Sequence, residues 1–368
     1  MANRSFQTTF LERFSHLFPP PAFLSMPAVG LDVSDSSVKM VEFQRGLSGT
    51  TLKRWGRAEL PKGSIMGGKI QDMKALADTL AQFRAEFGFT FVHASLPEQQ
   101  AYFFKTEVPY DIKASRIRQV LEFKLESNVP IPLRDAIFDY DLLEPKKKGD
   151  PITAGVTVYP ADAVEKFTSV LSQAGIVPLS LEIEAQAIER AVVPTEDDGV
   201  HMVIDFGETR TGIAIVHRST LVFTSTLEVR GRELTRAIME ELKVDAETAE
   251  QFKNESGILR NSGNAALSAH LMKTVTTLKE EIERHYAYWE SREKDPGHAG
   301  SINSVILCGG NANVAGLPEY LTESLQVPVE RANVWRNVFS FEEQVPEIDF
   351  AHSLSFATSI GLGLRALQ

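Results

Sequence analysis

The feature that most constrains the fold is a hairpin-like segment that occurs twice in the chain. Residues 28–43 read AVGLDVSDSSVKMVEF: an apolar run ends at Asp32, a Ser/Asp turn follows, and a second strand-like run begins at Val38. Residues 200–216, VHMVIDFGETRTGIAIV, repeat this plan around Asp205. One such turn is most often only a connection between strands. Two of them in one chain predict duplicated lobes that face each other.

The turns of both hairpins carry groups that bind anions. Backbone N–H groups of a tight turn, with short hydroxyl side chains beside them, form a cup for phosphate, and an acid at the tip can hold hydrated Mg²⁺. Residues 305–321, VILCGGNANVAGLPEYL, predict a strand, a glycine turn and a helix that begins near Leu317. Glycines let a ligand approach the backbone, and a helix N-terminus favours negative charge. We therefore expect a nucleotide at this third segment, with its phosphates between the two hairpins.

Composition excludes several classes of protein. A chain of 368 residues with 43% hydrophobic content can bury a large core and suggests two to three domains. A net charge of -11 argues against nucleic acid as a partner, since such binders need a basic face. The single cysteine, Cys308, excludes a disulfide framework, and the scattered histidines exclude a structural zinc site. With no long apolar run and no signal-peptide segment, we expect a soluble, cytoplasmic protein.

Residues 1–27 differ in character from the rest of the chain. They carry apolar side chains at spacings of three and four before a run of three prolines: Phe6, Phe10, Phe14, Leu17 and Phe18. This pattern predicts an amphipathic helix that the prolines end. Its apolar face can fold back on the protein, hold a partner or lie in a membrane interface. We favour packing on protein, and a membrane contact least, because the polar face lacks an excess of Lys and Arg.

A glycine-rich segment that follows the predicted third strand has the spacing of a phosphate-binding P-loop. Gly63, Gly68 and Lys69 match that spacing, but Ile70 stands where Ser or Thr must hold Mg²⁺. A proline loop, rather than a buried strand, leads into it. We reject a P-loop here and expect a helix capped by Asp72 to follow.

Residues 97–178 predict a compact α+β unit without phosphate-cup chemistry. The expected elements are a strand (101–108), a helix (112–128), two strands (136–143 and 152–159) and a helix (162–174). Because a fold alone does not imply activity and this unit carries no reactive constellation, we expect it to make contacts rather than to catalyse.

The two hairpins and the glycine turn resemble, in this order, the phosphate 1, phosphate 2 and adenosine motifs of the actin-like ATPase superfamily. A narrower resemblance, to the type IV pilus assembly protein PilM family, covers about residue 28 to the end. It rests on VGLDVSDSSVKMVEF, RIRQVLEFKLESNVPIPLRDAIFDYDLL, LSLEIEAQAIERAV, VIDFGETRTGIAIV, GRELTRAIMEELKVDAETAEQFK, LCGGNANVAGLPEYL and SFATSIGLGLRAL. The cell-division protein FtsA is less similar, because its relatives end in a membrane-targeting helix.

The resemblance implies an α/β, actin-like (ribonuclease H-like) two-lobed fold with an inserted α+β subdomain. The implied parts are an N-terminal amphipathic extension (1–27), the first part of lobe one (28–96), the inserted subdomain (97–178), the first connecting helix (179–199), lobe two (200–352) with a helical subdomain at about 236–300, and a second connecting helix (353–368) that returns to lobe one.

The resemblance also implies a site for ATP and Mg²⁺. The implied cofactor-binding residues fall on the three motifs and on one later helix: Asp32, Ser36, Ser37, Lys39, Gly207, Thr209, Thr211, Glu250, Lys253, Gly309, Gly310 and Asn311. Asp205 and Asp32 are the implied metal-holding acids, and Glu184 takes the place of a water-orienting catalytic acid. From the residues alone, a solvated helix face is the favoured explanation of Glu250 and Lys253, and the alternative for Glu184 is a surface carboxylate.

The chain departs from the family pattern directly after Asp32. The usual hydrophobic–Gly–Ser is Val33–Ser34–Asp35 here. We expect the Cβ of Ser34 to crowd the turn and the Asp35 carboxylate to lie where phosphate oxygens pass. No arginine is evident that would stabilise transition-state charge. These features predict weakened Mg-ATP binding and, at most, a slow ATPase; a nucleotide-binding scaffold is the favoured interpretation.

The implied function is that of a cytoplasmic component of a type IV pilus machine, or of a related type II secretion or competence machine, peripheral to the inner membrane through its partner. The implied partner is a PilN-like bitopic inner-membrane protein, whose cytoplasmic N-terminal peptide docks between lobe one and the inserted subdomain; pilus motor or platform proteins are further candidates. The alternatives are an FtsA-like filament-forming protein, a nucleotide-free scaffold, and a sugar or acyl kinase, for which we find no substrate motif.

Overall fold

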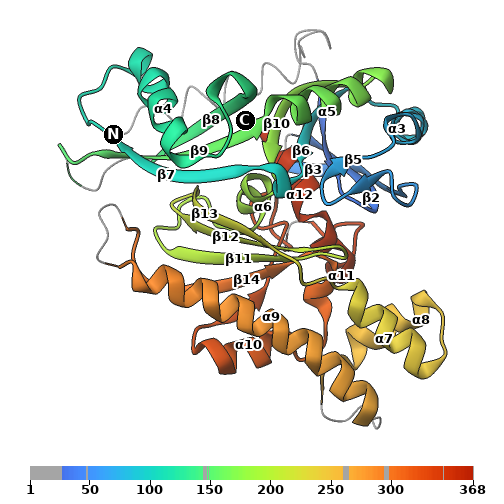
Figure 1. Ribbon diagram of the computed structural model, residues 1–368. Helices are drawn as coiled ribbons and strands as arrows, with labels where there is room; N and C mark the ends of the chain where they lie inside the picture. Colours follow the sequence, from blue (N-terminus) through green and yellow to red (C-terminus); the bar gives the residue numbers. More distant parts are fainter. Residues whose placement is uncertain are drawn as a thin grey trace.

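The computed structural model describes residues 27–46, 49–143, 147, 149–259, 265–293, 298–342 and 344–367. These residues form two five-stranded sheets, a three-stranded sheet and a short two-stranded hairpin. Figure 1 shows the second lobe below the first, with the three-stranded unit beside the first. Within the described ranges, no helix combines the length and the apolar character that a membrane crossing needs. The predicted N-terminal helix lies outside them.

The first sheet is built around the first predicted hairpin. Its strands are β1 (Ala28–Val33), β2 (Ser37–Gly46), β3 (Gly49–Glu59), β6 (Phe91–Leu96) and β10 (Val177–Ile183), in the order β10-β6-β1-β2-β3. The β1–β2 and β2–β3 pairs are antiparallel, whereas β6 pairs in parallel with both β1 and β10. Strand β1 is buried at every position, as a central strand covered on both faces should be.

The second sheet repeats the first in order and sense. Its strands are β11 (Val200–Phe206), β12 (Thr211–His217), β13 (Thr220–Leu227), β14 (Ser304–Cys308) and β15 (Val329–Arg331), in the order β13-β12-β11-β14-β15. Again two strand pairs, β11–β12 and β12–β13, are antiparallel, and two, β11–β14 and β14–β15, are parallel. The β1–β2 and β11–β12 hairpins therefore occupy equivalent positions, which confirms the duplicated lobes predicted from the sequence.

The inserted three-stranded sheet has a small core of its own. Its strands β7 (Tyr102–Val108), β9 (Ile152–Pro160) and β8 (Ala136–Leu143) lie in this order, and η2 (Leu133–Asp135) leads into β8. Helix α4 (Ala114–Asn128) buries the three predicted side chains Ile117, Leu121 and Leu125. These pack with buried residues of the three strands in a cluster separate from the main core.

Two segments near the end of the insertion differ from the predictions. Helix α5 (Ala161–Gln173) was predicted as part of the inserted unit, but its buried Phe167, Val170 and Leu171 join the core of the lobes. A connecting helix was expected from residue 179. Instead, Val177–Ile183 forms β10 at the edge of the first sheet, and helix α6 (Glu184–Val192) begins only afterwards. A short apolar run can form a strand or a helix, and here the parallel pairing with β6 makes residues 177–183 a strand.

The two connecting helices cross in backbone contact. Helix α12 (Ala357–Arg365) packs on α6 and on β1. A Cβ at Gly361 would lie 1.7 Å from the carbonyl oxygen of Ala187 on α6, and a Cβ at Gly30 would lie 2.1 Å from that of Ser359. Larger side chains have no room at these crossings, so the glycines fix how closely the helices join the lobes.

The remaining elements cover the sheets or connect them. In lobe one they are β4 (Ile65–Met66), β5 (Lys69–Ile70), α3 (Met73–Phe87) and η1 (Glu98–Gln100). In lobe two they are α7 (Arg232–Leu242), α8 (Ala246–Glu255), α9 (Ala265–Ser291), η3 (Gly310–Asn313), α10 (Leu317–Leu325), α11 (Phe350–Ser353) and η4 (Leu354–Phe356). The rejected P-loop segment forms the β4–β5 hairpin, and Asp72 caps α3 as predicted by accepting from the Ala75 amide at 2.9 Å. Figure 1 shows α7 and α8 projecting at one end of lobe two.

Candidate nucleotide-binding site

The turns of both hairpins and the Gly309 turn border one cleft of about 560 Å³. Both lobes contribute to its walls. Of the residues that the sequence singled out, all but Thr211 line it: Asp32, Ser36, Ser37, Lys39, Glu184, Asp205, Gly207, Thr209, Glu250, Lys253, Gly309, Gly310 and Asn311. Long-range folding thus brings together groups that lie up to 279 residues apart in the chain, from Asp32 to Asn311.

The first turn is held closed by its own serines. Ser34 donates its backbone N–H to the Ser37 carbonyl at 2.9 Å, and the Ser34 hydroxyl accepts from the Ser37 amide at 3.1 Å. Ser34 is not among the described residues with positive φ, so a side chain fits without strain. The predicted crowding by its Cβ is therefore wrong: the hydroxyl supplies hydrogen bonds that a glycine could not.

Asp35 does not lie where it was expected. Its two carboxylate oxygens accept from the backbone N–H groups of Gly67 and Gly68, at 2.9 and 3.0 Å. These amides belong to the turn between β4 and β5, and Asp35 is not part of the cleft lining. The predicted repulsion between Asp35 and phosphate is wrong, because the carboxylate points away and is neutralised in part by two donors.

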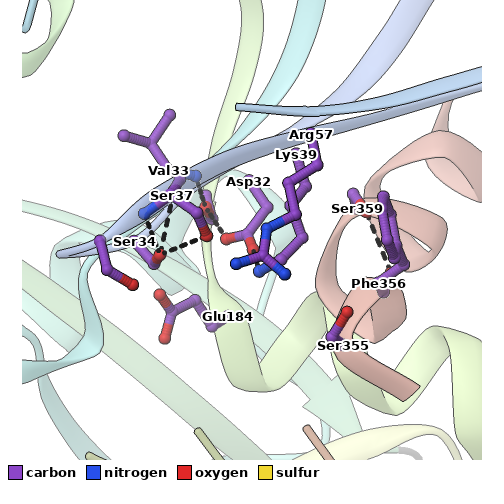
Figure 2. Close-up of polar contacts among 12 residues, drawn as sticks. Asp32, Val33, Ser34, Ser37, Lys39, Arg57, Glu184, Ser355, Phe356 and Ser359 are labelled. Atoms are coloured by element: carbon purple, nitrogen blue, oxygen red, sulfur yellow. Dashed lines mark hydrogen bonds and ion pairs between the residues drawn. The ribbon is translucent and has the colours of Figure 1, made fainter. Parts of the chain in front are cut away.

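Two aspartates from opposite hairpins lie at the floor of the cleft. Asp32 accepts from the Ser95 hydroxyl at 3.0 Å, and the Lys39 ammonium lies 3.5 Å from its other oxygen. Figure 2 shows Lys39 and Arg57 beside Asp32, with Glu184 near the Ser34–Ser37 turn. Burial, and then the charge of Asp32, raise the pKa of Asp205 to about 6, although Lys39 opposes this. Two carboxylates that disfavour each other's charge suit a site that takes up a cation.

The second turn contributes backbone and hydroxyl groups and a contact between the lobes. Glu208 accepts from the Ser36 hydroxyl of the first turn at 2.9 Å. Thr209 lines the cleft, but Thr211 is fully buried and donates its hydroxyl to the Val229 carbonyl at 2.8 Å. The predicted phosphate contact of Thr211 is therefore not supported, because its one donor already serves the fold.

Lys253 connects the helical part of lobe two to the Gly309 turn. Although it lies on a helix face, it is only 2% exposed. Its ammonium donates to three side chains: Glu250 (2.7 Å), Asn311 (2.7 Å) and Thr235 (3.1 Å). Burial lowers the pKa of Lys253. The solvated-face explanation is wrong for Lys253, which positions the turn that would carry the base or ribose.

Cationic side chains that sequence reasoning missed also reach the cleft. Arg57 on β3 is the cross-strand partner of Lys39, and Arg210 follows Thr209 in the second turn. Arg210 forms an ion pair with Glu184, the first residue of α6, with both side chains largely buried. The β2–β3 register would have located Arg57, since directly opposed residues share a face of the sheet. Nothing local in the sequence indicates the Arg210–Glu184 pair.

A buried carboxyl next to this ion pair was also missed. Glu98 on η1 is 6% exposed and accepts a hydrogen bond from the Ala185 backbone at the start of α6. Burial raises the pKa of Glu98 to about 7, while Arg210 lowers it and Asp205 raises it. Glu98 therefore links the segment after β6 to the start of α6 and to Arg210 of the second turn.

The Gly309 turn and the two aspartates bear on whether the cleft can take a magnesium–nucleotide complex. Gly309 adopts φ 82°, and a Cβ there would lie 2.4 Å from the Asp205 carboxylate, so only glycine leaves this approach open. Within the described part of the chain no three acidic, histidine or cysteine side chains form a metal cluster. Asp32 and Asp205 would therefore hold Mg²⁺ together with water and phosphate oxygens, its usual manner of binding.

Comparison with known proteins identifies the family. The model of the family described as type IV pilus assembly protein PilM matches residues 30–367. The chain belongs to this family. The family predicted from the sequence is therefore confirmed.

Individual relatives agree with the fold. A solved PilM-PilN type IV pilus biogenesis complex is 23% identical, covers 93% of this chain and 99% of that chain, and superposes with a TM-score of 0.75. The ethanolamine utilization protein EutJ from Carboxydothermus hydrogenoformans is 16% identical, covers 94% and 90%, and has a TM-score of 0.50. Cell division protein FtsA of Staphylococcus epidermidis is 22% identical over 340 residues, 82% of this chain and 73% of that protein. The predicted actin-like α/β fold is confirmed.

Proposed function

We propose that this PilM-family chain is a nucleotide-dependent clamp in a type IV pilus assembly machine. In this proposal it binds Mg-ATP between its lobes and docks the cytoplasmic N-terminus of a PilN-like inner-membrane protein, which would hold it at the inner membrane. The observation that carries the proposal is the single cleft at which both hairpin turns and the Gly309 turn meet. The similarity to a chain of a PilM–PilN complex supports the choice of partner.

Each wall of the cleft would bind a different part of the nucleotide. The backbone of the two turns, with Ser36, Ser37 and Thr209, supplies donors for the phosphates, and Lys39 adds a cation. Gly309 and Gly310 would let the nucleoside approach the backbone closely, beside Lys253. A magnesium ion at Asp32 and Asp205 would supply the charge that offsets the phosphates.

We expect slow turnover because two arginines of the cleft lining are paired with carboxylates. Arg210 is held by Glu184, and Arg57 donates to Glu59 at 2.6 Å. A carboxylate engaged by an arginine is a weak base for orienting water, and an arginine so engaged stabilises less transition-state charge. Bound ATP would therefore be hydrolysed slowly.

Isothermal titration with Mg-ATP, run beside a phosphate-release assay, tests this proposal. We expect saturable binding by the wild type and a turnover far below the 1–100 per second of typical kinases. Lys39→Met should weaken binding by more than tenfold, because a charge-assisted contact to phosphate contributes roughly 1.5–3 kcal/mol. The matched control Lys53→Met removes a lysine of β3 whose ammonium contacts Glu42 outside the cleft. Turnover at kinase rates would show an ordinary ATPase instead.

In this proposal, the partner peptide docks in a groove between lobe one and the inserted subdomain. It encloses about 500 Å³ between the β4–β5 hairpin, the segment after β6, and the first turns of α5. Its walls combine the apolar or aromatic Ile70, Tyr102 and Phe167 with the charged Lys69 and Lys166. Such a mixture suits an extended peptide that offers a few apolar anchors and main-chain hydrogen bonds.

Obstruction of this groove should abolish partner binding. Ala163→Arg places a long side chain from α5 into the groove, whereas Glu165→Arg adds the same side chain to a position of the same helix outside the lining. Fluorescence anisotropy with a labelled N-terminal peptide of the PilN-like protein should show micromolar binding to the wild type and to Glu165→Arg. We expect at least a tenfold loss for Ala163→Arg. Equal binding by both variants would place the peptide elsewhere.

Deletion of residues 97–178 would not isolate the groove. That deletion would remove α5, whose buried Phe167 and Leu171 belong to the main core, and the start of β10 in the first sheet. A loss of binding after it would report unfolding of lobe one rather than loss of the groove.

A further inference from the structure

One side chain connects the first phosphate turn with the wall of the partner groove. Asp35 stands in the turn between β1 and β2, and its carboxylate accepts from both amides of the Gly67–Gly68 turn, at 2.9 and 3.0 Å. Asp35 is 32 residues from Gly67 and 33 from Gly68 in the chain. Two hydrogen bonds to one carboxylate fix both the distance and the orientation of the turns, which a single contact would not do.

On the groove side, Gly68 is itself part of the lining. It adopts φ 72°, and a Cβ there would lie 2.7 Å from Pro97 and 2.9 Å from Gln99. Its carbonyl accepts from the Gln100 side chain. All of these residues line the groove, so a ligand there contacts the turn that holds Asp35.

On the cleft side, Asp35 is flanked by two serines of the first phosphate turn. Ser34 and Ser36 both line the cleft, and Ser36 donates to Glu208 of the opposite lobe at 2.9 Å. The hydroxyl of Ser34 and the amide of Ser37 set the shape of the turn. The position of Asp35 therefore sets the position of three cleft-lining serines.

We propose that Asp35 is a positioning residue that couples the partner groove to the nucleotide cleft, so that peptide in the groove tightens the binding of nucleotide. This inference rests on the proposed function, since it requires both ligands. A peptide that packs on the Gly67–Gly68 turn restricts the motion of that turn and, through two hydrogen bonds, of the phosphate turn. Nucleotide then binds a turn that is already ordered, which costs less conformational entropy and gives positive cooperativity. Because coupling is reciprocal, nucleotide tightens peptide binding by the same factor.

The test measures the dissociation constant of Mg-ATP with and without a saturating synthetic N-terminal peptide of the PilN-like protein. The full-length wild type, Asp35→Ala and Asp78→Ala are titrated in parallel. Asp78→Ala is the matched control, because it removes an exposed aspartate of α3 that pairs with Lys74 one helical turn away and lines neither the cleft nor the groove. Thermal melting of each protein establishes that it is folded.

We expect the peptide to tighten Mg-ATP binding about fivefold or more in the wild type and in Asp78→Ala. Asp35→Ala should still bind both ligands. Its dissociation constant for Mg-ATP should be nearly the same with and without the peptide. The inference is overturned if the peptide tightens Mg-ATP binding as much in folded Asp35→Ala as in the wild type. It is also overturned if the peptide does not change Mg-ATP binding by the wild type. Failure of the wild type to bind either ligand contradicts the proposed function itself, so the two failures are distinguishable.

Discussion

Gly361→Ala is expected to lower the free energy of unfolding by about 3 kcal/mol or more, the upper part of the range for overpacked sites. The added methyl carbon would lie 1.7 Å from the carbonyl oxygen of Ala187, a backbone atom of the crossing helix α6. Neither helix can yield without disturbing β1, on which α12 packs. Alanine's higher helix propensity favours the variant by only about 1 kcal/mol, so the steric effect dominates.

Gly363→Ala is the matched control, two residues along the same helix. There the nearest atoms are in the Phe43 ring, at 3.0 Å, and the nearest backbone atom outside the helix, the Val41 carbonyl oxygen, is at 3.3 Å, so a small shift of the ring makes most of the room. Urea unfolding of both variants should show a clearly smaller loss for Gly363→Ala. Equal losses, or a Gly361→Ala variant as stable as the wild type, would show that α6 and α12 do not cross in backbone contact.

Asp205→Asn is expected to stabilise the ligand-free chain at alkaline pH. Burial and Asp32 raise the pKa of Asp205 from 3.8 to about 6. Because the folded state holds this proton more tightly than the unfolded state, the associated stability is full below about pH 4 and is lost as the pH rises through 6. Two pKa units correspond to roughly 3 kcal/mol for a fully buried group, and we expect about 1–2 kcal/mol because the side chain opens onto the cleft.

The asparagine cannot ionise and so avoids this loss. Melting curves should show Asp205→Asn above the wild type at pH 8 and close to it at pH 4.5. A variant less stable than the wild type at pH 8 would mean that the Asp205 charge serves the fold. In that case, the stability of the ligand-free chain would give no support for a cation-binding role of Asp205.

Local chemistry made much of the site predictable from the sequence. Asp32 and Asp205 follow apolar runs and precede turns, and Gly309 must supply a positive φ, so each carries its own signal. The helical and strand periods also placed the inserted unit, including the inward face of α4. These features depend on residues close together in the chain.

What the sequence did not reveal depends on partners far away in the chain. Asp35 was placed against phosphate because its hydrogen-bond donors, Gly67 and Gly68, lie in another hairpin. The segment 177–183 becomes a strand because β6 offers a free parallel edge, which no local pattern indicates. Glu98 and the Arg210–Glu184 pair come together only when the lobes and α6 assemble. Long-range pairing, rather than propensity, decides such positions.

The central claim is that the cleft binds Mg-ATP through Asp205, and thermal melting at pH 8 with and without saturating Mg-ATP tests it most directly. Ligand at about 100 times its dissociation constant should stabilise the wild type by roughly 2.7 kcal/mol, a readily measured rise in Tm. Asp205→Asn should begin from a higher Tm and gain little from Mg-ATP, and omission of Mg²⁺ should remove most of the wild-type rise. A wild type whose Tm does not move at millimolar Mg-ATP would contradict the claim and leave a nucleotide-free scaffold.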